Sequence, residues 1–264
     1  MNAGTTNLNP HQTLEILAGW MLGQINSIRP HNAGSSGAKK FVVESAEGRF
    51  LLKGRPEGKL SSERLKLIRL ITTNCVKARV PVADFRPRAD GQRYMEWGGF
   101  IWELQSWING RDGRRSSNDA ISSGIALAKF HRATRNVQAP KIKGYHQRED
   151  IEKIARLALS HAPHAKSALC DLVTLAKVAR LKVQNRGIAA HHQQALHGDW
   201  HPRNLRFNSK GQVCGILDLD AVRTDALITE LATAVLQVSL RRSRDTPIEH
   251  WPEGLRYKSG QRLT

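Results

Sequence analysis

Two short segments in the last third of the chain constrain its fold and chemistry most. Residues 197–204 read His-Gly-Asp-Trp-His-Pro-Arg-Asn, and residues 216–220 read Ile-Leu-Asp-Leu-Asp. Asp199 and Asn204 lie five positions apart, and Asp218 ends an apolar strand after a hairpin-sized interval. Phosphoryl transfer needs a carboxylate beside the acceptor hydroxyl, hard oxygen ligands for magnesium and a cation for the phosphates. The two segments therefore predict a phosphoryl-transfer site.

The first third of the chain shows strand and turn signals around one amphipathic helix. Gly98-Gly99 between two apolar runs is typical of a tight hairpin, and Ser61 or Ser62 is a suitable helix N-cap. We expect helices over 10–23 and 61–74 and strands over 40–45, 50–53, 93–97 and 100–105. This part of the chain predicts a small antiparallel sheet with one crossing helix.

The remainder of the chain is richer in helical periodicity. We expect helices over 120–132, 150–183 and 228–240 and strands over 205–207 and 213–217. A strand-rich part followed by a helix-rich part predicts an α+β fold with two lobes. The boundary is placed near Asn109-Gly110, which gives an N-lobe over 1–108 and a helical C-lobe over 109–264.

Composition narrows the class of partner. The formal net charge is +18, but the basic residues are scattered and aromatic residues make up 6% of the chain, so we do not expect nucleic acid as a partner. No apolar run is long enough for a membrane span, and the N-terminus shows no secretory pattern. The three cysteines match no metal spacing. We expect a cytoplasmic protein with no membrane partner.

The motifs together resemble the aminoglycoside phosphotransferase family, which shares its fold with choline kinases and eukaryotic protein kinases. Residues 197–204 match the family pattern H-G-D-x-H-x-x-N, and residues 216–220 match its apolar pair followed by D-x-D. Residues 127–131 resemble the L-A-x-x-H helix of the family, and Glu230 opens a segment similar to its D-L-A helix start. The resemblance runs from about residue 25 to 240 and implies a two-lobed, protein-kinase-like fold.

The resemblance implies roles for the residues of the two segments. Asp199 looks like the catalytic base, and His197 looks like a residue that braces the loop. Asn204 and Asp218 look like magnesium ligands. Asp220 is similar to the second acid of the family motif and is a third candidate metal ligand.

The resemblance also assigns residues in the N-lobe. Lys53, at the end of an apolar strand, looks like the phosphate-binding lysine. Glu63 is the candidate to pair with Lys53 from the following helix. Gly34 and Gly37 belong to a small-residue loop over 32–37, whose backbone N–H groups could approach phosphates.

Residues 102–107 resemble the hinge, and Leu104 within it is a candidate contact for the nucleotide base. The implied cofactors are Mg²⁺ and ATP, with GTP left open. The implied acceptor is a hydroxyl of a small molecule, whose identity the sequence does not give.

Two other interpretations stay open. Family members have more helices after the D-L-A-like segment, so the short tail over 241–264 suggests a truncated C-lobe and a non-catalytic nucleotide-binding protein. His197, Asp199 and His201 also form an H-x-D-x-H pattern that could ligate a transition metal in a metallohydrolase.

Overall fold

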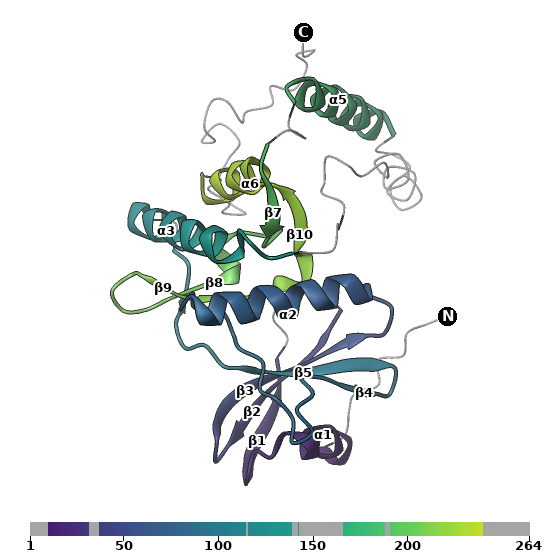
Figure 1. The fold of residues 1–264 in the computed structure, drawn as a ribbon, viewed down its shortest axis with the longest axis vertical. Helices are drawn as coiled ribbons and strands as arrows, with labels where there is room; N and C mark the ends of the chain where they lie inside the picture. The colour runs from purple at the N-terminus through teal and green to yellow at the C-terminus, as the bar shows by residue number, and fades with distance from the viewer. Residues whose placement is uncertain are drawn as a thin grey trace.

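The fold has two lobes, a sheet-based N-lobe and a mainly helical C-lobe, with the helix α2 between them (Figure 1). The computed structural model describes residues 10–31, 37–114, 116–138, 142, 166–187 and 191–239. This is the α+β, protein-kinase-like architecture expected from the sequence.

The N-lobe sheet is antiparallel, and its strands lie in the order β1-β2-β3-β5-β4. The strands are β1 (Ile25–Pro30), β2 (Lys39–Ser45), β3 (Gly48–Pro56), β4 (Met95–Trp97) and β5 (Phe100–Ser106). Gly98 and Gly99 both have positive φ, of 60° and 74°, as the tight β4–β5 turn requires. Strand β1 was not predicted, because this edge strand has polar Asn26, Ser27 and Arg29 among its residues.

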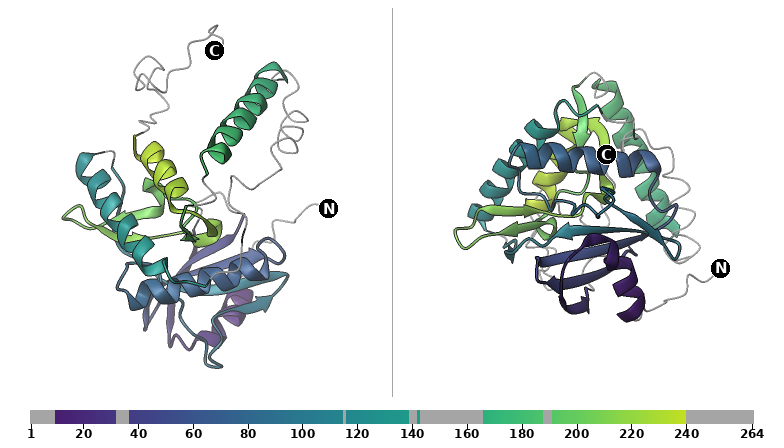
Figure 2. Two further views of the ribbon diagram at one scale, coloured as in Figure 1. Left: turned by 45° about the horizontal axis from the view of Figure 1, so that its top comes forward. Right: turned by 60° about the horizontal axis from the view of Figure 1, so that its bottom comes forward.

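Helix α1 (Pro10–Leu17) covers the face of the sheet that lies away from α2, as Figures 1 and 2 show. The helix is shorter than expected: a 3₁₀ turn follows, and Met21 adopts a left-handed conformation with φ 47°. This turn brings Trp20 into the core, where its indole N–H donates to the Arg86 carbonyl at 2.8 Å. The tertiary contact therefore ends the helix early.

Helix α2 (Ser62–Lys77) begins at Ser61, whose side chain accepts from the Arg64 N–H at 3.2 Å. This cap satisfies a backbone donor of the first turn, as the sequence predicts. The apolar residues of α2 belong to the same core as residues of the C-lobe, and none of them belongs to the core under α1. The helix is thus packed into the C-lobe.

The C-lobe contains two small sheets and helices around them. Its elements are β6 (Arg111–Asp112), α3 (Ser117–Thr134), α5 (Lys166–Asn185), β7 (Gln193–Leu196), β8 (Leu205–Phe207), β9 (Val213–Ile216), β10 (Arg223–Ala226) and α6 (Leu227–Ser239). β7 pairs with β10, and β8 lies between β6 and β9. The sequence anticipated α3, α6, β8 and β9; the first part of the helix expected over 150–183 lies outside the described residues.

We propose that the lobe boundary lies at Asn109-Gly110. Strand β5 of the N-lobe sheet ends at Ser106, and β6 starts at Arg111 and pairs with β8 of the C-lobe. Among the helices that the structure describes, none is long and apolar enough to cross a membrane.

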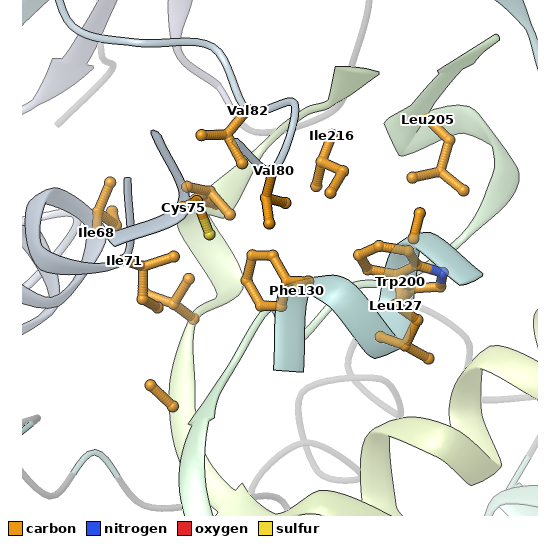
Figure 3. Packing of buried hydrophobic residues seen from close by; sticks show 14 of the residues in the cluster. Ile68, Ile71, Cys75, Val80, Val82, Leu127, Phe130, Trp200, Leu205 and Ile216 are labelled. Atoms are coloured by element: carbon orange, nitrogen blue, oxygen red, sulfur yellow. The ribbon is translucent and has the colours of Figure 1, made fainter. Parts of the chain in front are cut away.

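The larger core joins α2 to the C-lobe (Figure 3). Phe130 of α3 is fully buried, and its ring lies 5.9 Å from that of Trp200 and 5.8 Å from that of His197. Ile71 and Cys75 of α2 belong to the same cluster. This core therefore packs against the loop that carries His197 and supports it.

Phe130→Ala should lower the free energy of unfolding by roughly 3–5 kcal/mol, because it removes a fully buried ring and leaves a cavity. Ile125→Ala on the same helix is the matched control, since Ile125 is 54% exposed, and its effect should stay within about 0.5 kcal/mol. Urea unfolding measures both. Equal losses in the two variants would contradict the described core.

Candidate active site

The candidate active site lies where β3 of the N-lobe meets the loops that follow β7 and β9. Lys53 lies on β3, and its Nζ is 3.0 Å from Oδ1 of Asp218, 165 residues further along the chain. The Lys53 side chain is only 4% exposed. Chain folding thus joins the two predicted halves of the site through a charged contact.

The loop after β7 requires a glycine at its second position. Gly198 has φ 87°, and a Cβ there would lie 1.9 Å from the Ala221 carbonyl oxygen. The Gly198 N–H donates to Glu230 Oε1 at 2.6 Å, and its carbonyl accepts from Arg223 at 2.7 Å. The loop is therefore anchored from α6 and β10.

His197 is a fully buried, neutral side chain. Its Nδ1 accepts from the Asp199 N–H at 3.2 Å, so the ring proton is on Nε2, which donates to the Leu217 carbonyl at 2.9 Å. Burial lowers the pKa of His197 below its ordinary value. His197 thus links the loop after β7 to Leu217, the residue that follows β9.

Glu230 of α6 supports the same loop, a role that its place in the predicted motif did not indicate. Its carboxylate accepts from the backbone N–H groups of His197 and Gly198 and lies 2.8 Å from Nε2 of His131 on α3. Burial alone would raise the pKa of Glu230, but these hydrogen bonds outweigh it and lower the pKa. The carboxylate therefore fixes the loop as an anion.

Asp199 presents a half-exposed carboxylate. Its Oδ2 lies 3.3 Å from Nε2 of His201, whose Nδ1 accepts from the Arg203 N–H at 3.1 Å. The hydrogen bond from His201 lowers the pKa of Asp199, and partial burial opposes this only in part. Asp199 is therefore ionised at neutral pH, as a proton acceptor must be.

Asn204 is buried beside Asp199. Its Nδ2 donates to the Asp199 carbonyl at 2.9 Å and to Oδ2 at 3.0 Å. The Asn204 carbonyl accepts from the Leu217 N–H at 2.8 Å, which ties the loop to the strand end that carries Asp218. Since Nδ2 is used, the amide oxygen is the group available for a cation.

Asp218 adopts a left-handed conformation, with φ 59° and ψ 72°. This conformation is costly for a residue other than glycine, and strained residues of this kind cluster at active sites. Asp218 directs Oδ1 to Lys53 and keeps 28% of its side chain exposed.

Asp220 is held by two cations. Its Oδ2 lies 2.9 Å from Lys53, and its Oδ1 accepts from Nε and Nη2 of Arg55 at 3.0 and 2.8 Å. Burial alone would raise the pKa of Asp220, but Lys53 and Arg55 hold it well below its usual range. Because both oxygens are engaged, Asp220 is less suited to a metal than Asp218.

The expected pair between Glu63 and Lys53 is not formed. Glu63 lies exposed in the first turn of α2, where hydrogen bonds from its own backbone N–H and from Ser61 and Ser62 lower its pKa. A carboxylate is favourable at a helix N-terminus, so helix capping explains this residue. The carboxylates of Asp218 and Asp220 bind Lys53 instead.

The other predicted nucleotide contacts are less closely tied to the site. Gly34 lies outside the described residues, and Gly37 lies next to the start of β2 with φ 63°. Leu104 is fully buried in the N-lobe core, and its carbonyl accepts from the Arg86 N–H at 2.8 Å. Neither its side chain nor its carbonyl is therefore open to a nucleotide base.

A groove of about 410 Å³ lies beside the segment that joins the lobes. It is lined by Arg49, Trp107, Ile108, Asn109, Gly110, Arg111, Asp112 and Arg206. Its lining includes residues 107–110 and contains none of the candidate site residues Lys53, Asp199, Asn204 and Asp218.

The donor set fits a hard divalent cation such as Mg²⁺. Asn204 and Asp218 offer an amide and a carboxylate oxygen, and Mg²⁺ is commonly held by one or two protein ligands together with substrate phosphates. Within the described part of the chain, no three His, Cys, Asp or Glu side chains gather closely enough to hold a metal ion. Both ring nitrogens of His197 are engaged, so the H-x-D-x-H metallohydrolase interpretation is not supported.

The two-lobed fold and this polar site define a kinase-like phosphotransferase. The model of the phosphotransferase enzyme family matches residues 27–256, and the chain belongs to this family. A search of curated protein sequences gave no match.

Solved structures show the same fold. An amicoumacin kinase in complex with AMP-PNP and Ca²⁺ has a TM-score of 0.65 and 12% identity, over 88% of this chain and 70% of that one. Spectinomycin phosphotransferase with ADP and spectinomycin has a TM-score of 0.63 and 15% identity, over 86% and 73%. An aminoglycoside phosphotransferase from Alicyclobacillus acidocaldarius has a TM-score of 0.59 and 16% identity, over 90% and 74%.

The neutral state of His197 predicts acid sensitivity. Because its folded pKa lies below its unfolded pKa, the unfolded state binds more protons as pH falls below about 6.5, and stability drops by up to about 1.4 kcal/mol per pH unit. His197→Gln, which can still donate to Leu217 but does not titrate, should show a flatter pH dependence between pH 5 and 7. His192→Gln, at an exposed position, is the control. Urea unfolding against pH measures this, and equal slopes in wild type and His197→Gln would contradict it.

Proposed function

We propose that this protein transfers the γ-phosphoryl group of ATP, bound with Mg²⁺, to a hydroxyl of a small molecule. The observation that carries the proposal is the assembly of Lys53, Asp218 and the Asp199–Asn204 pair into one site from distant parts of the chain.

Each residue has a role that follows from its surroundings. Asp199, ionised and half-exposed, would accept the proton of the acceptor hydroxyl as the oxygen–phosphorus bond forms and the bond to the departing diphosphate breaks. Lys53 would pair with the phosphates. Asn204 and Asp218 would hold Mg²⁺, which neutralises charge on the phosphates.

Two further observations support a nucleotide as the phosphoryl donor. Solved structures of the same fold contain AMP-PNP, ADP or GDP. A formal charge of +18 attracts polyphosphates to the surface. We propose ATP as the donor, with GTP as the alternative to be compared directly.

Asp218→Asn should weaken Mg-ATP binding at least about tenfold, because it removes the charge of a proposed metal ligand. Thermal unfolding with and without Mg-ATP measures this: a ligand present at about 100 times its Kd stabilises the folded wild type by about 2.7 kcal/mol. Asp171→Asn, at an exposed position on α5, is the control and should retain the shift. A wild-type protein that melts cooperatively without any nucleotide-dependent shift would contradict nucleotide binding.

Asp199→Asn should keep the thermal shift and lose about 10²–10⁴-fold in the rate of phosphoryl transfer, because the amide cannot accept a proton. An acceptor screen with radiolabelled ATP, covering neutral, anionic and cationic alcohols, measures the transfer. A variant as active as wild type would contradict the base role. Nucleotide binding without transfer to any acceptor would support a non-catalytic nucleotide-binding protein instead.

A further inference from the structure

A network of ion pairs with alternating charge runs from α2 through the N-lobe sheet into the candidate active site. In order, its members are Arg69, Glu103, Arg55, Asp220, Lys53 and Asp218. Three of them, Arg55, Glu103 and Lys53, are at most 4% exposed. The sequence motifs gave no role to Arg55 or Arg69, and they included Glu103 only in the hinge-like segment 102–107.

Arg55 is the central member. It lies two residues after Lys53 on β3, so the two side chains share one face of the strand, and Glu103 on β5 is the register partner of Lys53 on that face. The guanidinium binds Asp220 Oδ1 through Nε and Nη2 and binds Glu103 through Nη1. A planar fork of donors is suited to hold two carboxylates in fixed positions at once.

At the α2 end of this network, the contact between Arg69 and Glu103 is longer than the other ion pairs. Arg69 Nη2 lies 3.6 Å from Glu103 Oε1, which has no hydrogen-bond partner among the described residues. Arg69 also lies over the ring of Tyr94, at 4.3 Å from its centroid. Helix α2 thus meets this face of the sheet with a cation, where the resemblance had suggested a carboxylate for Lys53.

We propose that Arg55 is a positioning residue for the nucleotide site: it fixes Asp220, and Asp220 holds Lys53 beside Asp218. The Arg55–Glu103 pair therefore takes the place of a carboxylate from α2. The inference rests on the proposed function for its readout, since what Arg55 positions is the proposed phosphate and metal site.

Charge and burial explain why Arg55 is difficult to replace by itself. Burial alone would lower the pKa of Arg55, but Glu103 and Asp220 raise it above its ordinary value, so the guanidinium stays charged. Removing only Arg55 would leave the buried Glu103 carboxylate with only Arg69 nearby among the described residues, at 3.6 Å, and Asp220 with only Lys53, which is unfavourable for folding. A test therefore has to remove Arg55 and Glu103 together.

The double variant Arg55→Met/Glu103→Gln should fold, because it removes the buried cation and the buried anion of the Arg55–Glu103 pair together. We expect its Kd for Mg-ATP, measured by titration calorimetry, to rise about tenfold or more. A purely structural role of Arg55 would lower the urea midpoint without changing the Kd of the folded protein for Mg-ATP.

The matched control is Arg29→Met/Glu44→Gln, which makes the same changes in an exposed ion pair of the same sheet. Its affinity for Mg-ATP should equal that of wild type. Arg55→Lys, which keeps the charge but not the fork, is the second variant should the double variant fail to fold. It should also bind Mg-ATP more weakly.

Folded Arg55 variants with wild-type affinity for Mg-ATP would overturn the inference and leave the proposed function intact. A wild-type protein that binds no nucleotide would overturn the proposed function and the inference with it. The two failures are therefore distinguished by the wild-type titration alone.

Discussion

The contact of Lys53 with Asp218 and Asp220 is the interaction on which the candidate active site depends. It connects β3 of the N-lobe to the strand end of the C-lobe across a separation of 165 residues. A buried lysine is stable as a cation only when carboxylates compensate it, and each of these carboxylates is in turn held in a defined position. Asp220 is fixed by Arg55, and Asp218 lies in a left-handed conformation at the end of β9. Electrostatic compensation thus adds a charged contact between the lobes to the apolar core that joins α2 to the C-lobe.

A second buried polar cluster fixes the opposite side of the site. Glu230 of α6 binds the backbone of the loop after β7, and His131 of α3 binds Glu230. Neutral His197 then connects this loop to the Leu217 carbonyl. Satisfied buried networks of this kind restrict a loop to one conformation, and the Phe130 core beneath it excludes water. Asp199 is therefore presented by a rigid support, although its own carboxylate is half-exposed.

The sequence predicted much of the fold, because local signals agree with the elements that form. The Gly98-Gly99 turn, the Ser61 cap and the periodicity of α3 each specify their own element. The edge strand β1 was missed because its polar residues carry no alternation, and α1 was predicted too long because burial of Trp20 ends the helix. These errors arise where tertiary contacts override local preference.

The sequence by itself determined the chemical groups of the site: the spacing of Asp199, Asn204 and Asp218 follows from one loop and one strand, whose geometry is local. Only the tertiary structure decided which charges meet. It separated Glu63 from Lys53 and brought Arg55 and Glu103 into the site. The reason is that ion pairs between distant segments depend on how helices and sheets pack, and spacing along the chain carries no information about that packing.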